Sequence, residues 1–293
     1  MKTYELTNGV MTAKIRTLGA ELISLQKCST GQEYMWKADP EYWSRVSPVL
    51  FPFVGKLKNQ QYSYNGTVYY PKPHGFARDM VFAVIEKEED RIVLEITDSE
   101  ETMKVYPFQF VFRIAYKLEG ESLNVSFLVI NKGENDMYFS LGAHPGFACP
   151  LREDENRKDC YIGFDHVEKL NSRGVDIQTG LVNDVYREYP LENGLLSIAD
   201  NMFENDALVL EQQGITTVTL YDKEKVPYLS LKMDAPVYGI WSAAKEGAPF
   251  VCIEPWFGRC DASDFVGKLE EREYQTCLEA GEKFESYYVI TVI

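Results

Sequence analysis

Two Asn-Gly pairs, each set between short runs of alternating apolar and polar residues, constrain the fold of this 293-residue chain most strongly. Asn8-Gly9 lies inside residues 3–15, and Asn65-Gly66 lies inside residues 62–70. Asn-Gly favours the tight turn that joins two antiparallel strands, so both segments are predicted β-hairpins. We therefore expect strands that pair directly with their neighbours in sequence.

Further strands are predicted wherever alternating or β-branched runs recur. These runs are residues 91–97, 108–118, 122–131, 216–221, 228–233 and 287–293. Helical signals are limited to residues 265–272 and to residues 40–45, where Asp39 can cap the first turn. The polar, weakly periodic segment 151–190 predicts loops and edge strands laid over the main sheets. The predicted fold is all-β with few short helices, and without a repeat or linker we expect a single domain over residues 1–293.

Charge and cysteine content exclude several classes of partner. A formal net charge of −15 opposes binding to nucleic acid and to anionic membrane surfaces, and no apolar run approaches the roughly 20 residues that span a bilayer. Residues 1–6 lack the apolar segment of a secretory signal, so we expect a cytoplasmic protein. Six cysteines without a C-x-x-C pair predict reduced thiols, with neither a zinc site nor a disulfide framework. We expect a monomer or weak homodimer.

Two of the three histidines lie in segments rich in small residues. His74 belongs to Pro-His-Gly-Phe-Ala-Arg-Asp, and His144 belongs to Gly-Ala-His-Pro-Gly-Phe. Pro145 restricts His144 to an extended backbone, and the flanking glycines leave room for close approach to its ring. Such a ring is either presented to a small molecule or bonded to a carbonyl inside a turn. His166 is not flanked by glycine and proline in this way, and we expect it at an ordinary surface position.

A carboxylate ends an apolar strand-like run late in the chain. Glu254 follows residues 249–253, precedes Pro255 and Trp256, and shares a strand face with Cys252. A carboxyl group beside so much apolar surface is either paired or has a raised pKa, and a raised pKa suits a base near neutral pH. The alternative is a glutamate that only bonds to backbone at the strand end. Trp256 resembles the aromatic platforms on which sugar rings stack.

The segments His-Gly-Phe-Ala-Arg (74–78), Ala-His-Pro-Gly-Phe (143–147) and Glu-Pro-Trp (254–256) resemble, in order and spacing, the three signature blocks of the galactose mutarotase-like superfamily of aldose 1-epimerases. The similarity covers essentially the whole chain and looks closest to the subgroup named after the LacX protein of the lactose operon. It implies a large antiparallel β-supersandwich. It also implies a small-molecule sugar substrate and interconversion of the α and β anomers of an aldohexose, without a metal or cofactor.

The resemblance also implies roles for individual residues. His144 matches the general acid that protonates the ring oxygen, and Glu254 matches the base that takes the proton from the anomeric hydroxyl. His74 matches a histidine that orients the sugar. Asp206 resembles a carboxylate that binds sugar hydroxyls, although a turn or capping role is equally open. Opening a hemiacetal requires one proton to be removed and one delivered, so one positioned acid and one positioned base suffice.

The cationic contact to the sugar is less clearly assigned. Galactose enzymes of the superfamily carry arginines before the first histidine block, whereas this chain offers Arg45 or Lys56, so galactose specificity does not follow. Arg78 follows the histidine block as in relatives that act on hexose 6-phosphates, which makes a hexose-6-phosphate mutarotase an alternative. The other interpretation of Arg78 is a salt bridge to a neighbour such as Asp79.

Two further functions stay open at this point. A glycoside hydrolase would use Glu254 and Asp206 as its carboxylate pair. A non-catalytic sugar-binding or sensing protein would keep the pocket without the reaction, because a fold does not fix a function. The presence of both His144 and Glu254 argues against the second of these.

Overall fold

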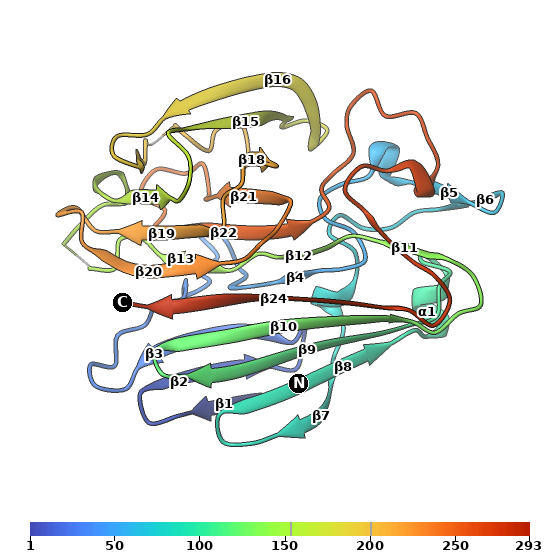
Figure 1. Ribbon diagram of the computed structural model, residues 1–293, viewed down its shortest axis with the longest axis horizontal. Coiled ribbons are helices and arrows are strands. Elements are labelled where there is room, and N and C mark those ends of the chain that lie inside the picture. Colours follow the sequence, from blue (N-terminus) through green and yellow to red (C-terminus); the bar gives the residue numbers. More distant parts are fainter. Residues whose placement is uncertain (153, 200) are drawn as a thin grey trace.

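The computed structural model describes residues 1–152, 154–199 and 201–293, and β-strands dominate it (Figure 1). Within these ranges the strands form antiparallel sheets, and the one α-helix is α1 (Glu100–Met103). The prediction of an all-β fold with few short helices is confirmed. Among the residues that the structure describes, no helix combines the length and apolar character that a membrane crossing requires.

The larger of the two main sheets has nine strands. Five of them, β24, β10, β9, β8 and β7, run across the lower half of Figure 1. In spatial order the strands are β17 (Leu195–Ser197), β14 (Tyr161–Phe164), β19 (Thr217–Tyr221), β20 (Pro227–Lys232), β24 (Lys283–Val292), β10 (Ser122–Asn131), β9 (Phe110–Glu119), β8 (Arg91–Thr97) and β7 (Ala83–Lys87). Alternate residues of β9, such as Phe112 and Ile114, are fully buried. The period-two pattern of the sequence therefore sets which face of this sheet meets the core.

The second main sheet has eight strands, seven of them in its main path, and carries the candidate site. In spatial order these are β16 (Leu181–Pro190), β15 (Lys169–Asp176), β18 (Leu208–Glu211), β21 (Val237–Trp241), β22 (Phe250–Phe257), β12 (Leu141–Ala143) and β4 (Val49–Leu50), with β13 (Gly146–Ala148) also paired to β22. β22 is buried on both faces, which explains why it reads as a continuous apolar run rather than an alternating one.

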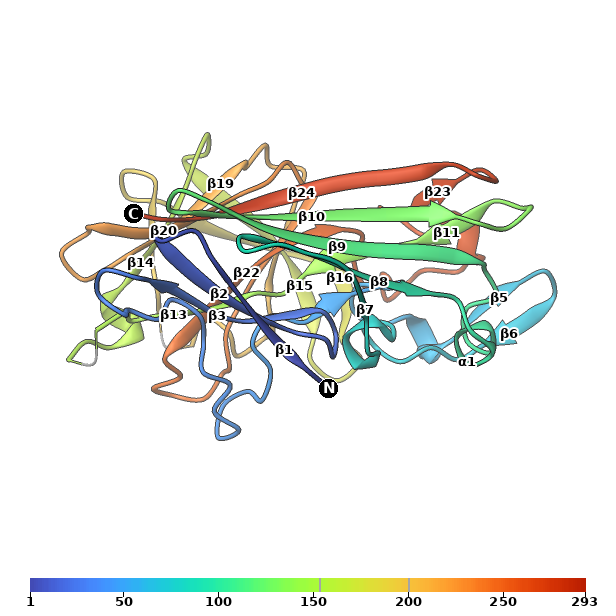
Figure 2. The same ribbon diagram turned by 90° about the horizontal axis from the view of Figure 1, so that it is seen from below.

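Smaller sheets and turns complete the fold. They are β1 (Thr3–Thr7), β2 (Met11–Arg16) and β3 (Glu21–Lys27); β5 (Tyr62–Tyr64) with β6 (Thr67–Tyr69); β11 (Met137–Phe139) with β23 (Thr276–Leu278); and the 3-10 turns Lys58–Gln60, Ala77–Asp79, Arg157–Asp159 and Leu269–Glu271. Figure 2 shows the β1–β3 sheet as a layer against β9 and β10. The buried Tyr116 hydroxyl on β9 donates to the Ala20 carbonyl (2.7 Å) and so joins the two layers.

Most local predictions are confirmed. Both Asn-Gly segments are hairpins, with Thr7 opposite Thr12 and Tyr64 opposite Thr67. All six predicted runs are strands, although the last begins at Lys283, four residues earlier than expected. In the 151–190 segment β16 is an edge strand as predicted, whereas β14 and β15 lie inside the two main sheets.

The two predicted helices are wrong. Residues 40–45 form a single turn, in which the Asp39 carbonyl accepts from the N–H groups of Tyr42 and Trp43. The Trp43 ring packs against Trp241 and Phe250. Residues 265–272 hold one 3-10 turn, and Gly267 within the segment weakens any longer helix.

Candidate active site

A cavity of about 510 Å³ opens over the central strands of the eight-stranded sheet. Seven of the eight predicted site residues line it, namely Lys56, His74, Arg78, His144, Asp206, Glu254 and Trp256. Arg45 is not among its lining residues. The three sequence blocks 74–78, 143–147 and 254–256 thus all contribute to one cavity.

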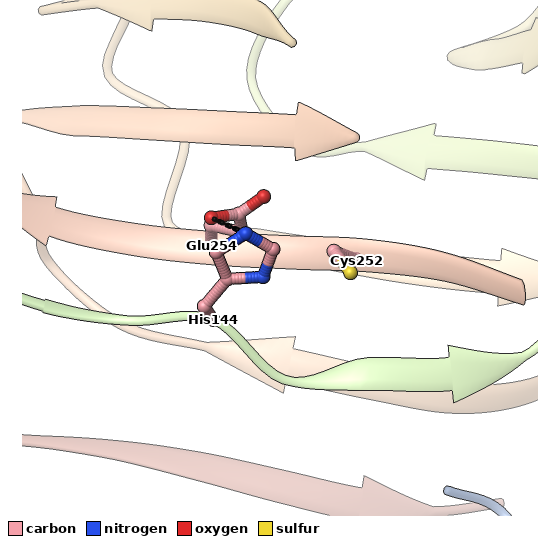
Figure 3. A group of neighbouring side chains, drawn as sticks. All are labelled: His144, Cys252 and Glu254. Atoms are coloured by element: carbon pink, nitrogen blue, oxygen red, sulfur yellow. Dashed lines mark ion pairs between the residues drawn. The ribbon is translucent and has the colours of Figure 1, made fainter. Parts of the chain in front are cut away.

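Strand register brings His144 and Glu254 together. β12 places Gly142 opposite Trp256, and β13 places Gly146 opposite Cys252, so counting inward from both pairs sets His144 opposite Glu254. The ladder is interrupted there because Pro145 has no N–H to donate. His144 Nε2 lies 3.1 Å from Glu254 Oε2 (Figure 3).

The His144 ring is held between aromatic side chains. It stacks on Trp43 with ring centroids 4.8 Å apart and an interplanar angle of 28°, and it meets Trp241 edge-on at 5.5 Å. Its side chain is 12% exposed. Burial, with a smaller contribution from His74, holds the pKa of His144 well below its usual 6.5. The imidazole is therefore neutral around pH 7.

Burial acts in the opposite direction on Glu254, whose side chain is 1% exposed. Burial raises the pKa of Glu254 well above its usual 4.5, and the charge of Asp206 adds to this, while the Trp256 indole opposes it. A neutral imidazole then faces a protonated carboxyl group. The pair holds one proton that either side chain can carry. Such a pair can remove a proton from one oxygen of a substrate and deliver a proton to a neighbouring oxygen.

His74 is fixed in one tautomer by the Gly55 peptide. The backbone N–H of His74 donates to the Gly55 carbonyl (2.8 Å), and Nδ1 of the His74 ring accepts from the Gly55 N–H (3.2 Å). Since Nδ1 accepts, a neutral ring carries its hydrogen on Nε2. Burial, helped by the charges of Arg78, Arg45 and Lys56, lowers the pKa of His74 to about 3. His74 is thus a neutral hydrogen-bond donor at the cavity.

The glycines beside His144 serve a different purpose from the one expected. A Cβ on Gly142 would come within 2.6 Å of Trp256 Cδ1, and one on Gly146 within 3.0 Å of Trp43. The space that these glycines leave is therefore filled by tryptophan rings rather than left for a ligand. Trp256 also lies over Gly239 of β21.

Two cations line the cavity without a carboxylate partner in the described part of the chain. Lys56 forms no salt bridge there, and Arg78 donates Nη2 to the Pro73 carbonyl (2.9 Å) while its buried Nε has no partner. The expected alternative for Arg78 does not form, because Arg45 Nη2 takes Asp79 instead (2.8 Å). That ion pair engages Arg45 at the surface, away from the cavity lining.

Asp206 has the predicted turn role and also lines the cavity. It lies in a left-handed backbone conformation (φ 69°), and its Oδ1 accepts from the Ala207 N–H (2.8 Å), as in a turn. The residue is exposed and lines the cavity. His166 is at the surface with its side chain 70% exposed, as expected.

Sequence reasoning found only one of the three tryptophans that line the site, Trp256. The chain has four tryptophans, and Trp43, Trp241 and Trp256 all line this one cavity. The helix predicted for residues 40–45 includes Trp43, and the sequence predicts no role for Trp241. The rarity of tryptophan was the available signal, although only the fold shows that these residues converge.

A buried carboxylate behind the site was also missed. Glu21 Oε1 accepts from the N–H groups of Val46 and Ser47 (2.9 Å each), and its other oxygen pairs with Arg16. The same segment supports the His144 turn, because the Pro48 carbonyl accepts from the His144 N–H (3.1 Å). Glu21 therefore positions the backbone on which His144 stands.

We expect Glu21→Ala to lower the free energy of unfolding by about 3 kcal/mol, because it leaves two amides and a guanidinium without their acceptor. Glu21→Gln keeps an oxygen for both amides and should cost about 1 kcal/mol. Urea unfolding of the two variants and the parent chain measures the difference. Equal losses for Ala and Gln would show that the amides do not depend on this side chain.

Two groups of three side chains in the described part of the chain place potential metal ligands within 4.8 Å of one another. His144, Cys252 and Glu254 form one group inside the site. The other group is Glu155, Asp222 and Glu224, which Arg152 and Lys223 approach at 3.6–3.8 Å. The second group is thus already paired with two cationic side chains.

Comparison with known proteins adds to this picture. A family model described as aldose 1-epimerase matches residues 2–290. The chromosomal protein LacX of Lactococcus lactis subsp. lactis is 32% identical over 304 residues, which cover 99% of each chain.

Two solved structures are also similar over their whole length. A galactose mutarotase related enzyme from Lactobacillus acidophilus is 35% identical with a TM-score of 0.94, over 100% of this chain and 97% of that one. A galactose mutarotase-like protein from Lactobacillus casei is 27% identical with a TM-score of 0.92, over 100% of both chains. These neighbours agree with the β-supersandwich predicted from the sequence.

Proposed function

The chain belongs to the aldose 1-epimerase family, and we propose that it interconverts the α and β anomers of an aldohexose, with Glu254 as base and His144 as acid. The observation that carries this proposal is the 3.1 Å approach of His144 Nε2 to Glu254 Oε2 on a cavity large enough for a sugar. The anomeric and ring oxygens of a hemiacetal share one carbon, so an acid and a base that serve both must reach into the same cavity.

The shared proton of the pair fits both directions of the reaction. For ring opening the imidazole is protonated and the carboxylate is charged: Glu254 takes the proton of the anomeric hydroxyl while His144 protonates the ring oxygen. The C–O bond breaks and an aldehyde forms. Rotation about the C1–C2 bond presents the other carbonyl face. Closure then needs the neutral imidazole and the protonated carboxyl group that opening has produced, so no net proton is consumed.

The remaining lining residues suit a sugar ring. His74 Nε2–H is a fixed donor for a sugar oxygen, and the Asp206 carboxylate is an acceptor for hydroxyl protons. The Trp256 indole offers an apolar face for ring C–H groups.

The pKa directions predict an unusually broad pH plateau for kcat. Activity is lost at low pH when the pair takes up a second proton on His144, whose pKa is held well below 6.5. It is lost at high pH when the proton leaves Glu254, whose pKa is raised well above 4.5. We therefore expect no inflection near pH 6.5. Exchange NMR across the pH range, corrected for spontaneous mutarotation, measures this, and a half-loss of kcat at pH 6.5 would contradict it.

The direct test is to measure anomer exchange by NMR for a panel of free aldohexoses, with an aryl glycoside added as a separate substrate. Faster-than-spontaneous exchange without glycoside cleavage supports the proposal. Cleavage of the glycoside would favour a hydrolase that uses Glu254 and Asp206. Saturable sugar binding without acceleration would identify a non-catalytic sugar-binding protein.

Lys56 and Arg78 favour a second candidate, a mutarotase for hexose 6-phosphates. In a chain with a net charge of −15, two cavity cations without carboxylate partners are suited to an anionic substituent. Replacing Lys56 or Arg78 with Met should then raise KM for a 6-phosphorylated hexose at least tenfold and leave that for the free hexose within twofold. Equal effects on both substrates would rule out a phosphate contact.

A further inference from the structure

Cys252 lies beside the acid–base pair and has no part in the proposed reaction. It is two residues from Glu254 on the same face of β22, and it is fully buried with a free thiol. Figure 3 shows it further along β22, with the His144 ring reaching over the same strand. We propose that His144, Cys252 and Glu254 form a binding site for a thiophilic divalent cation such as Zn²⁺, and that its occupation blocks the active site.

The geometry is close to that of a zinc site. One ligand atom from each side chain lies within 4.8 Å of the other two. Zinc bonds of about 2.0–2.3 Å to nitrogen, oxygen and sulfur require ligand atoms roughly 3.5 Å apart, so small side-chain rotations complete the set. β22 fixes the separation of two ligands, and the strand register fixes the third opposite them.

Two of the three ligand side chains keep a buried polar atom without a hydrogen-bond partner in the described part of the chain. These atoms are His144 Nδ1 and Glu254 Oε2, and Oε2 also makes the ionic contact with the imidazole. Buried polar atoms without partners are costly, which favours a ligand that satisfies them. Because His144 and Glu254 line the cavity, an ion can enter through it and keep its fourth position for water.

The chemistry of the three ligands selects the cation. One imidazole nitrogen, one sulfur and one carboxylate oxygen suit Zn²⁺, whereas Mg²⁺ and Ca²⁺ prefer oxygen ligands alone. The Cys252 thiol releases its proton on binding, so that thiolate and carboxylate balance the charge of the ion. The bound ion engages the base and the acid at once, which leaves neither free to move a proton.

The binding test needs no sugar and is independent of the proposed function. Chelator-treated protein is titrated with Co²⁺, as a spectroscopic substitute, and with Zn²⁺ by calorimetry. We expect one ion per chain and a thiolate-to-cobalt charge-transfer band in the parent chain. Cys252→Ser should lose the band and bind roughly tenfold or more weakly. Cys260→Ser, which changes a buried cysteine that lines the cavity but is not one of the three ligands, is the matched control and should behave like the parent.

An unchanged band in Cys252→Ser, its loss in Cys260→Ser, or no ion bound by the parent chain would overturn the proposal. If Cys252→Ser does not fold, His144→Ala answers the same question, because it must also weaken Co²⁺ binding.

The blocking effect rests on the proposed mutarotase activity and is measured separately. Zn²⁺ should inhibit anomer exchange, and addition of a chelator should restore the rate. Cys252→Ser should keep its basal rate and require at least tenfold more Zn²⁺ for half-inhibition. Zn²⁺ binding without inhibition would support the metal site and reject only the claim that its occupation inhibits anomer exchange.

Discussion

Glu254→Gln should slow anomer interconversion by roughly 10²–10⁴-fold, to near the spontaneous rate, because the amide cannot accept the proton of the anomeric hydroxyl. The substitution conserves size and hydrogen-bonding shape, so the fold should be retained. Exchange NMR on a saturating aldohexose gives the rate, and circular dichroism confirms folding.

The same variant has a stability readout with a defined sign. The pKa of Glu254 is raised in the folded chain, so its contribution is fully present below about pH 4.5 and is lost as pH rises towards the folded-state pKa. Urea unfolding should therefore show Glu254→Gln gaining stability relative to the parent as pH rises above 4.5. Glu95→Gln, whose parent carboxylate pairs with Arg113 on the other main sheet, is the control and should keep full activity. A folded Glu254→Gln with unchanged exchange would reject the assignment of the base.

His144→Ala should reduce the rate by a similar factor, because the departing ring oxygen then has no proton donor. The loss leaves an imidazole-shaped space between Trp43 and Glu254. We therefore expect added imidazole to restore part of the activity, which a purely structural role of His144 would not allow. His166→Ala, at an exposed position, should be without effect.

The double variant distinguishes one relay from two independent groups. If His144 and Glu254 exchange a single proton, the double variant should be hardly slower than either single variant. Multiplicative losses would instead indicate that the two side chains act separately.

The candidate site shows where sequence reasoning reached its limit. The three blocks around His74, His144 and Glu254 were recognisable because each is a short segment whose residue types and order can be read directly from the sequence. The choice between Arg45 and Arg78 was not, since it depends on which guanidinium reaches Asp79 in space. Trp43 and Glu21 were missed for the same reason: each acts on His144 through contacts between segments far apart in sequence.

What the sequence alone determined about this protein is its β character, its hairpins and the residue types of its chemistry. These depend on turn propensity and on a period of two residues, which are properties of short segments. Only the tertiary structure decided that His144 stands opposite Glu254, that tryptophans fill the space beside the glycines, and that burial moves the two pKa values in opposite directions. Register and burial arise when distant strands pack together, because the environment of a side chain is set by neighbours that local sequence does not specify.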